Sequence, residues 1–561
     1  MKATCLFAIL MLSSIFVVNA QDLGALTASL QQTIVPVQTA SKKYEPKLES
    51  VQPGVLRYGY TEIDQKGNST AYLYEFNLAD IDPYAVREVT QKDVIFSVLT
   101  VLNKQKLVKV TKNEEVQPYN IEVSIVAKDI QNARAVSEVV KKAIPLAEKA
   151  AASRLKVAGY DGTMTWLTSH VSDVTLGAKS YKQTLSRGDK PGVLVFKVVE
   201  SDGKSSTEEI YSFNIADLNE NMINYKISGN RFALDLETMQ KGKFIHVRKD
   251  GQVRPFVSSL SINTNNVDEA RDLKTVLAMA IPLAKEKVRA DIPQVSTEKD
   301  GLQKLKVLVG DLDYGSKQVT QTMEPQCYCA VTQTERDPKS TEVNVYKFNW
   351  MDINPNTSNI DVTGERLFIL LETVDKQKMM MHSKDDKFAG YENDLRVYFA
   401  DMESARRAKA TVDKVAEKCK AAYKEPFGAD TKAIVAWLIG NVKEVSQDDI
   451  TFKQTLSQVE QGNNSKLKFT RQEINSKGSG NEEVYEFALA DVNPLAVHVA
   501  VQGKWLYVTI EADFKNKIFN YYKDGKIQPY QSSIRFAVSD TETARNMVGA
   551  LKKSSKALKP K

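Results

Sequence analysis

The 561-residue chain is too long for one hydrophobic core, so several domains are expected. Its 42% apolar and 26% charged residues, with only 26 Gly and 17 Pro, exclude a collagen-like or wholly disordered chain. There are 76 Lys and Arg against 70 Asp and Glu, and the resulting net charge of +6 is too small for this length to indicate a nucleic-acid-binding protein.

The first twenty residues have the pattern of an export signal. Lys2 supplies the positive start, an apolar stretch runs from Leu6 to Val18, and Val18-Asn19-Ala20 is typical of a cleavage site. The apolar stretch is shorter than the roughly 20 residues that span a bilayer, and no later stretch approaches that length. We therefore predict an exported protein, periplasmic or extracellular and from a Gram-negative bacterium, with no transmembrane segment after cleavage.

One motif occurs four times in the remaining chain. Tyr74-Glu75-Phe76-Asn77-Leu78-Ala79-Asp80 returns with variations at Tyr211, Tyr346 and Tyr485, so the spacings are 137, 135 and 139 residues. An Ala-Arg pair follows each Tyr by 59 residues, at Ala133, Ala270, Ala405 and Ala544. A unit of this size is a domain and not a solenoid repeat. We expect a signal at 1–20 and repeats at 21–150, 151–290, 291–424 and 425–561.

The fourth repeat predicts the elements of the unit. Apolar residues at helical spacing indicate an opening helix over Thr431 to Val445. Alternating or β-branched segments indicate about seven strands, and Asp524-Gly525 is typical of a hairpin turn between strands. The strands should pair in chain order as an antiparallel meander. A closing helix follows, whose apolar stripe in the first repeat is Ala133, Val136, Val140, Ala143, Ile144 and Ala147.

This order of elements predicts an α+β fold that is mainly antiparallel β. Seven strands followed by one closing helix resemble the pleckstrin-homology superfold, here in four tandem copies, and the export signal makes the whole similar to exported bacterial repeat proteins. Pleckstrin-homology domains that bind inositol lipids carry a basic cluster in the first strand-strand loop, and the corresponding loop here is Gln458 to Asn464. The resemblance therefore implies the fold and not the lipid-binding activity.

The motif Asp recurs as Asp80, Asp217, Asp352 and Asp491, and an Asp or Asn follows two residues later. Calcium needs about 6–8 oxygen ligands, and no Glu follows at a fixed offset. We expect the motif Asp to bond its own backbone where the strand turns a corner.

Lysines recur at three fixed positions, 30, 32 and 38 residues after the motif Tyr. Lysines at strand ends and edges typically protect against edge-to-edge aggregation, which is the role we expect first. They are also candidate anion-binding residues. These lysines are Lys104, Lys106, Lys112, Lys241, Lys243, Lys249, Lys376, Lys378, Lys384, Lys515, Lys517 and Lys523. No aromatic residues suited to base stacking accompany them.

An aromatic residue recurs later in the same hairpin, as Tyr119, Phe256, Tyr391 and Tyr530, each just after a Pro or Gly. It fits packing in the core or loop, or else an exposed anchor for a partner.

The cysteines left after cleavage of the signal, Cys327, Cys329 and Cys419, all lie in the third repeat. In an exported protein we expect a disulfide from Cys419 to Cys327 or Cys329, which leaves one free thiol. Zinc would need a fourth ligand that the pattern does not supply.

No catalytic constellation recurs among the repeats. The four His residues occupy different offsets, and neither His-x-x-x-His nor Gly-x-Ser-x-Gly is present. We predict a non-enzymatic binding or scaffold protein, without cofactor, that presents four modules to an envelope or extracellular partner. One alternative is a binder of anionic envelope polymer or lipid head groups through the lysines, and another is a carboxylate-based hydrolase in one repeat.

Overall fold

The structure, a computed structural model, describes residues 22–228, 231–314, 317–460 and 465–559. The export signal predicted at Met1 to Ala20 lies outside these residues. The chain forms two compact units, one of residues up to Gly251 with Phe256–Arg289 and one of Gln252–Pro255 with Ala290 onward. Repeats 1 and 2 make up nearly all of the first unit, and repeats 3 and 4 nearly all of the second.

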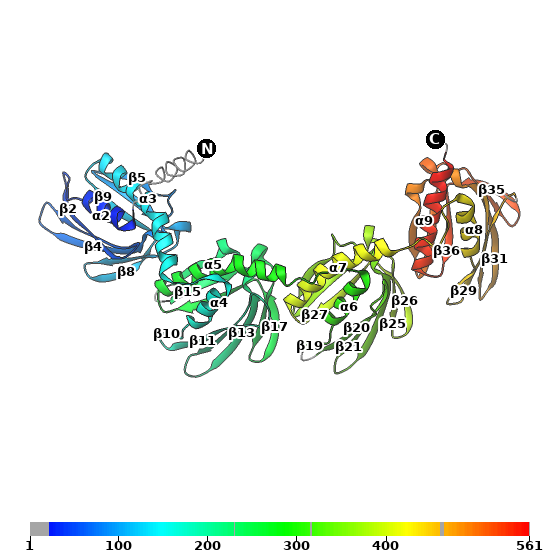
Figure 1. Cartoon of the computed structure of the whole chain (residues 1–561), viewed down its shortest axis with the longest axis horizontal. Helices are drawn as coiled ribbons and strands as arrows, with labels where there is room; N and C mark the ends of the chain where they lie inside the picture. Colours follow the sequence, from blue (N-terminus) through cyan, green and yellow to red (C-terminus); the bar gives the residue numbers. More distant parts are fainter. Residues whose placement is uncertain (1–21, 229–230, 315–316, 461–464, 560–561) are drawn as a thin grey trace, which may run out of the picture. The chain divides into compact units, whose positions relative to one another are not determined.

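Within the described residues, each repeat has a helix at each end and nine strands between them (Figure 1). Repeat 1 consists of α2 (Leu23–Thr33), β1 (Val37–Gln38), β2 (Lys42–Gln52), β3 (Val55–Asp64), β4 (Ser69–Asn77), β5 (Arg87–Gln91), β6 (Val94–Thr100), β7 (Val108–Lys112), β8 (Glu115–Asn120), β9 (Glu122–Ala127) and α3 (Ile130–Arg154). Repeat 2 consists of α4 (Gly159–Ser169), β10 (Val174–Leu176), β11 (Lys179–Arg187), β12 (Val193–Ser201), β13 (Ser206–Asn214), β14 (Asn224–Ser228), β15 (Arg231–Glu237), β16 (Ile245–Lys249), β17 (Gln252–Val257), β18 (Ser259–Thr264) and α5 (Val267–Ala290).

The second unit repeats the same series. Repeat 3 consists of α6 (Glu298–Leu308), β19 (Leu312–Asp313), β20 (Gln318–Met323), β21 (Tyr328–Arg336), β22 (Thr341–Asn349), β23 (Asn359–Thr363), β24 (Arg366–Glu372), β25 (Met380–Lys384), β26 (Lys387–Glu392), β27 (Asp394–Phe399) and α7 (Met402–Ala422). Repeat 4 consists of α8 (Thr431–Asn441), β28 (Val445–Gln447), β29 (Ile450–Gln458), β30 (Lys466–Asn475), β31 (Gly478–Ala488), β32 (His498–Gln502), β33 (Trp505–Glu511), β34 (Phe519–Lys523), β35 (Lys526–Gln531), β36 (Ser533–Val538) and α9 (Thr541–Leu558).

The strands form two antiparallel sheets in every repeat, and their order corrects the predicted meander. In repeat 4 the larger sheet has the order β28-β29-β30-β31-β34-β35 and the smaller sheet the order β32-β33-β36. After β31 the chain crosses to the smaller sheet, returns to pair β34 with β31, and crosses again to pair β36 with β33. Sequence periodicity locates strands but carries no information on these two crossings.

The expected number of strands, about seven, is also wrong, because β28 and β35 have weak sequence signals. β28 is only three residues long. β35 contains Pro529, which a strand at the edge of a sheet tolerates because no ladder hydrogen bond is lost. The Asp-Gly hairpin is confirmed, since Asp524 and Gly525 have φ of 48° and 73° between the paired β34 and β35.

The closing helix completes the core of each repeat. Figure 1 shows α3, α5, α7 and α9 lying against the sheets of their own repeats. The apolar stripe predicted for α3 is confirmed, because all six of its residues are at most 2% exposed. A side chain at the N-cap holds the start of the helix, as Asp129 does by accepting a hydrogen bond from Asn132 N at 2.8 Å.

In the described part of the chain, no helix has the length and apolar character that a membrane crossing requires.

Candidate functional site: a polar cavity in the second repeat

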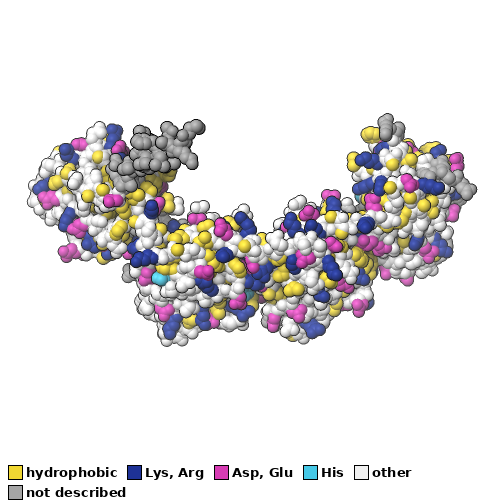
Figure 2. Space-filling view, in the orientation of Figure 1, with side chains coloured by type: hydrophobic (Ala, Val, Ile, Leu, Met, Phe, Trp, Pro, Cys, Tyr) yellow, Lys and Arg dark blue, Asp and Glu magenta, His cyan; other side chains and the backbone are white. Residues whose placement is uncertain are grey.

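The three recurring lysines of each repeat do not converge on one point. The first ends a short 3-10 turn, and the third ends the strand after it, as Lys104 and Lys112 do around β7. A strand of five residues extends roughly 16 Å, so the first two lysines lie at one end and the third at the other. All twelve are exposed except the half-buried Lys249. Figure 2 shows basic and acidic side chains interspersed over the visible face.

The first lysine of each set has a backbone conformation that explains part of the recurrence. Its φ is 52° at Lys104, 56° at Lys241, 53° at Lys376 and 57° at Lys515. The residue before it is also left-handed in every repeat. The pair therefore makes a sharp bend that returns the chain from the smaller sheet to the larger one.

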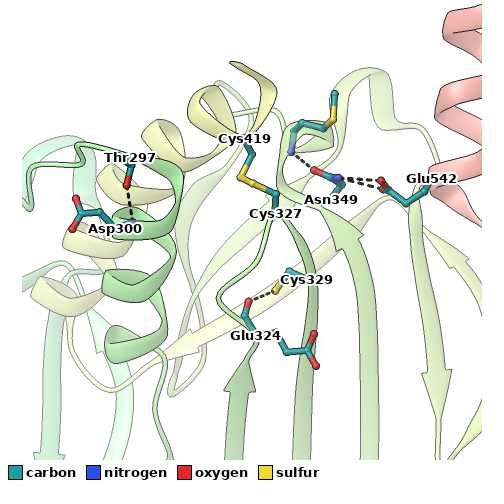
Figure 3. Close-up of a disulfide and its surroundings, with 9 residues drawn as sticks. Thr297, Asp300, Glu324, Cys327, Cys329, Asn349, Cys419 and Glu542 are labelled. Atoms are coloured by element: carbon teal, nitrogen blue, oxygen red, sulfur yellow. Dashed lines mark hydrogen bonds between the residues drawn. A yellow bond between two sulfur atoms is a disulfide. The ribbon is translucent and has the colours of Figure 1, made fainter. Parts of the chain in front are cut away.

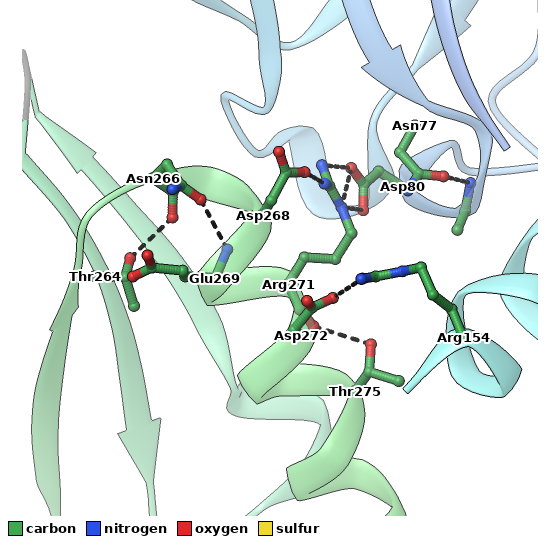
Figure 4. Close-up of polar contacts among 11 residues, drawn as sticks. Asn77, Asp80, Arg154, Thr264, Asn266, Asp268, Glu269, Arg271, Asp272 and Thr275 are labelled. Atoms are coloured by element: carbon green, nitrogen blue, oxygen red, sulfur yellow. Dashed lines mark hydrogen bonds and ion pairs between the residues drawn. The ribbon is translucent and has the colours of Figure 1, made fainter. Parts of the chain in front are cut away.

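The motif Asp has a role different from the one expected. Asp80 is 9% exposed, and its carboxylate accepts hydrogen bonds from Arg271 of α5, in the next repeat (Figure 4). The turn is held by the polar residue two positions later, because Asp82 Oδ1 accepts from Tyr84 N at 2.9 Å. Asn219, Asn354 and Asn493 make the same bond in their repeats. The self-bonding expected of the motif Asp belongs to its neighbour.

The structure joins Cys327 to Cys419 in a disulfide and leaves Cys329 free (Figure 3). The bond ties the loop before β21 to α7. Cys329 is 1% exposed and its thiol donates to Glu324 O at 3.1 Å. Burial raises the pKa of Cys329 to about 12, so the thiol is protonated at neutral pH.

Three of the four His residues contact aromatic rings. His170 stacks on Trp166 at 4.0 Å between ring centroids, and His382 stacks on Tyr346 at 4.5 Å. Among the residues that the structure describes, no three His, Cys, Asp or Glu side chains are grouped so that they could hold a metal ion.

Repeat 2 contains a cavity of about 600 Å³ between its two sheets. Strands β11, β12, β13 and β16 of the larger sheet form one wall, and β14, β15 and β18 of the smaller sheet form the other. Four carboxylates line it, Glu200, Glu209, Asp235 and Glu237. Three basic residues line it too, Lys226, Arg231 and Lys249. Its size falls in the range of small-molecule sites.

A small residue on the larger sheet opens this cavity. Val198 of β12 faces Glu209 of β13 across the sheet. The corresponding cross-strand pairs in the other repeats have a larger first residue, as Tyr60 with Tyr72, Gln333 with Asn344, and Arg471 with Glu483. These side chains fill the space, since Tyr60 stacks on Tyr72 at 5.0 Å and Arg471 Nε donates to Glu483 at 3.1 Å.

A second small residue lies on the smaller sheet. Ala233 of β15 stands where the other repeats have Phe96, Phe368 and Tyr507, as the hairpin registers show. These aromatic residues belong to apolar clusters that join the two sheets in repeats 1, 3 and 4. Ala233 lies between Arg231 and Asp235, which line the cavity from the same face of β15. Both exchanges thus put a smaller side chain at or beside the cavity wall.

The cavity wall is also more polar than its counterparts. Asp235 stands where the other repeats have Val98, Leu370 and Thr509. Asp235 accepts a hydrogen bond from Ser261 and lies 3.6 Å from Lys226 Nζ. These exchanges convert an apolar contact between sheets into a site that can form hydrogen bonds with a ligand.

Glu209 is the best-defined charged group of the wall. It accepts a hydrogen bond from Tyr211 Oη at 2.5 Å and from Lys249 Nζ at 2.9 Å. Burial tends to raise the pKa of Glu209, but these two donors outweigh it and hold the pKa below its ordinary value. Burial, followed by Glu209 itself, raises the pKa of Tyr211. The carboxylate is therefore ionised and the phenol is protonated near neutral pH.

The remaining polar groups are fixed in place by the scaffold. Arg231 Nε donates to Asn263 Oδ1 at 3.1 Å, and its guanidinium lies 5.9 Å from the ring centre of Tyr181. The buried Gln183 holds the Asn263 backbone, donating to its carbonyl at 2.9 Å and accepting from its N–H at 3.0 Å. Fixed donors and acceptors of this kind give a binding site its specificity.

Of the residues predicted from the sequence, Lys249 lines the cavity and the other lysines do not. Sequence reasoning missed the cavity itself. The four repeats differ in sequence at Val198 and Ala233. This difference points to the cavity only when the strand register is known. Neither a protein-family model nor a curated protein matches this chain.

Proposed function

We propose that this is an exported binding protein whose second repeat takes up a small hydrophilic ligand, and that the ligand class is carbohydrate. The observation that carries the proposal is the polar cavity, lined by Val198, between two sheets that apolar clusters join in the other repeats. In this proposal, the other three repeats are scaffold modules of the same fold, and only repeat 2 binds the ligand.

The lining favours a neutral polyhydroxy ligand over an ion. Four acidic and three basic side chains nearly balance, so neither an anion nor a cation finds a site of one charge sign. Carboxylates and amides accept hydrogen bonds from hydroxyl groups, while lysine and arginine donate to ring and hydroxyl oxygens. Tyr181 and Tyr211 add aromatic surface to the wall.

A carboxylate hydrolase in one repeat is the second candidate, because four carboxylates meet in this cavity. Glycoside hydrolysis needs an ionised carboxylate and a second carboxyl whose raised pKa lets it act as an acid. Glu209, with its lowered pKa, suits the ionised role. Because the Lys249 and Tyr211 bonds already occupy Glu209, we favour binding over catalysis.

The test of the proposed function is refilling the cavity. The full signal-free chain is screened by calorimetry and thermal unfolding against a panel of neutral mono- and disaccharides. We expect at least one sugar to bind, and the variant Val198→Tyr/Ala233→Phe, which copies repeat 1, to remain folded and lose binding. Binding that survives refilling, or a chain that binds no sugar of the panel, contradicts the proposal.

A matched pair of variants locates the site. Glu209→Gln removes a carboxylate from the cavity, whereas Glu483→Gln changes the equivalent position of repeat 4, which pairs with Arg471. Only the first should weaken sugar binding. Release of product from aryl glycosides by the wild type, abolished by Glu209→Gln, would favour the hydrolase.

Binding of anionic polymer or lipid head groups through the lysines is the weaker alternative. The separation of each Lys pair from the third Lys along a strand gives no three-lysine site. Lys249 and Lys384 are also engaged by Glu209 and Glu342. Binding to anionic vesicles or polymer that falls steeply with salt would support this alternative.

We also propose that the likeness to pleckstrin-homology domains is limited to the general plan of two sheets closed by a helix. The long closing helix supports this likeness. The pairing of β31 with β34 and of β33 with β36 is not that of a sequential meander.

A further inference from the structure

The joint between repeats 1 and 2 uses both recurring motifs of the sequence. Arg271 of the Ala-Arg pair donates from Nη2 to Asp80 at 2.6 Å and from Nε at 3.0 Å. The two side chains are 10% and 8% exposed. Asp268 binds the same guanidinium (Figure 4). The motif Asp of one repeat and the Arg of the next thus form one contact.

Repeats 3 and 4 are joined in the same way. Arg545 Nε donates to Asp352 Oδ1 at 2.8 Å, and these side chains are 12% and 13% exposed. Glu542, which corresponds to Asp268, binds the same Arg at 2.5 Å. It also accepts from Asn349 at 3.2 Å (Figure 3). The joint is therefore a repeated feature and not an accident of one pair.

Apolar contacts accompany each joint. Tyr119 of repeat 1 packs edge-on against Phe232 of repeat 2 at 5.5 Å between ring centroids. Tyr391 of repeat 3 belongs to the core cluster of repeat 4, against which Val499 and Val501 also pack. The recurring aromatic residue is thus an anchor for the following repeat.

Each repeat therefore has two different faces. We call tail face the surface around the motif Asp and the recurring aromatic residue, and head face the surface around the Arg at the start of the closing helix. In the joints of repeats 1 and 2 and of repeats 3 and 4, a tail face binds the head face of the following repeat. This contact is heterologous, since the two surfaces differ.

The tail face of repeat 4 is uncovered. Tyr530 is 54% exposed, whereas the equivalent Tyr391 is 5% exposed. Ile518 is 42% exposed, whereas the equivalent Leu107 and Met379 are each 4% exposed. Asp491 is exposed and forms no ion pair with another described residue. Apolar side chains that are buried in the other joints face solvent here.

No other described repeat covers the head face of repeat 1 either. Ile130 is 38% exposed, whereas the equivalent Val267 and Thr541 are 8% and 1% exposed. Arg134, the equivalent of Arg271 and Arg545, is exposed and has no ion-pair partner among the described residues. Within the described residues, the chain thus carries a tail face with an acid and a head face with a base that no other repeat covers.

We propose that the chain associates head to tail with further copies of itself, the tail face of repeat 4 binding the head face of repeat 1 in a second copy. Asp491 pairs with Arg134 in this contact, and Tyr530 and Ile518 pack beside Ile130. Because the contact is heterologous, it produces chains of molecules or closed rings. This inference is independent of the cavity in repeat 2.

The head face of repeat 1 makes this contact weaker than the internal joints. Glu88 and Thr90 stand at the register positions that Tyr225 and Ile227 occupy in repeat 2. Less apolar surface is therefore buried, and association should be reversible and dependent on concentration.

Charge reversal tests the proposal on the full signal-free chain by sedimentation velocity over a wide concentration range at low salt. The wild type should associate as its concentration rises. Asp491→Arg alone and Arg134→Asp alone should each require at least about tenfold higher concentration, because like charges then face each other. An equimolar mixture of the two variants should associate again, since the arginine introduced in one variant then meets the aspartate introduced in the other.

The mixture separates a lost contact from a damaged fold, because misfolded variants do not rescue each other. A wild type that stays monomeric, variants that associate as the wild type does, or a mixture without rescue each overturns the proposal. Sugar binding is measured on the same variants and should be unchanged.

Discussion

Asp80 and Arg271 lie 191 residues apart in the sequence and meet in a buried ion pair that joins two repeats. Asp352 and Arg545 repeat the arrangement at a separation of 193 residues. In both pairs, the Asp comes from the earlier repeat and the Arg from the later one. In these two joints, the recurring motifs therefore supply the two sides of the contact between neighbouring repeats.

Arg271→Ala should loosen the joint between repeats 1 and 2 by about 3 kcal/mol, because it leaves the Asp80 carboxylate buried without its partner. Hydrogen exchange of the full chain measures this loss as faster exchange at Asp80 and at the start of α5. Arg134→Ala is the matched control, since Arg134 has the same place in repeat 1 and is exposed. At concentrations where the chain is monomeric, equal effects of the two variants would contradict the joint.

The sequence predicted the elements of this fold better than their partners. The stripe of α3 and the Asp524-Gly525 hairpin depend on local spacing, which a sequence displays directly. Asp80 was assigned to a local turn because the sequence gives no sign of a partner 191 residues away. That partner became visible only when the strands and helices were placed.

The candidate site shows the same limit. Val198 and Ala233 are unremarkable as single residues, and each is ordinary in a strand. Their effect depends on the register that sets Val198 opposite Glu209 and on the packing of one sheet over the other. The lysines, by contrast, recur at a regular spacing that is visible in the sequence, and the left-handed bend at Lys104 and its equivalents partly explains it.

Glu209 should make the free energy of unfolding of repeat 2 depend on pH in the acid range. Its folded pKa lies below the ordinary value of 4.5, so its contribution is complete above that pH and is lost as pH falls through the folded pKa. Glu209→Gln should therefore cost about 1 kcal/mol at pH 7 and nothing below that folded pKa. Urea unfolding at a series of pH values measures both, and a cost that persists in strong acid would exclude this role of the ionised carboxylate.

The disulfide should stabilise repeat 3 through the long loop that it closes. Cys327 and Cys419 are 92 residues apart. Closing a loop of that length raises the free energy of the unfolded chain by about 4.6 kcal/mol, because it lowers its conformational entropy. Cys327→Ala/Cys419→Ala should lower the unfolding midpoint of the third repeat, and a reducing agent should do the same to the wild type. The double variant itself should no longer respond to the reducing agent.

Cys329 should remain unreactive in the folded protein. Its thiol is 1% exposed, and burial raises its pKa to about 12, so access and thiolate formation are both suppressed. A thiol reagent at pH 8 should label it only as fast as repeat 3 opens, and denaturant should accelerate labelling. Rapid labelling of the native chain would show that the thiol is accessible.

Variants at the left-handed bend can distinguish whether the recurring lysine serves the backbone conformation or supplies a charge. Lys515 has φ of 57°, a conformation that glycine adopts freely and a β-branched residue resists. Lys515→Gly should therefore leave the stability of repeat 4 almost unchanged, whereas Lys515→Val should cost about 1–2 kcal/mol.

Lys517→Val is the matched control for this position. Lys517 is also exposed but is not among the residues with positive φ, so the change should have little effect on stability. Thermal and urea unfolding of the three variants measure the difference, with binding to anionic vesicles as the second readout. If Lys515→Gly abolished binding to anionic vesicles while stability held, the lysine would be retained for its charge, because the backbone requirement is met equally well by glycine.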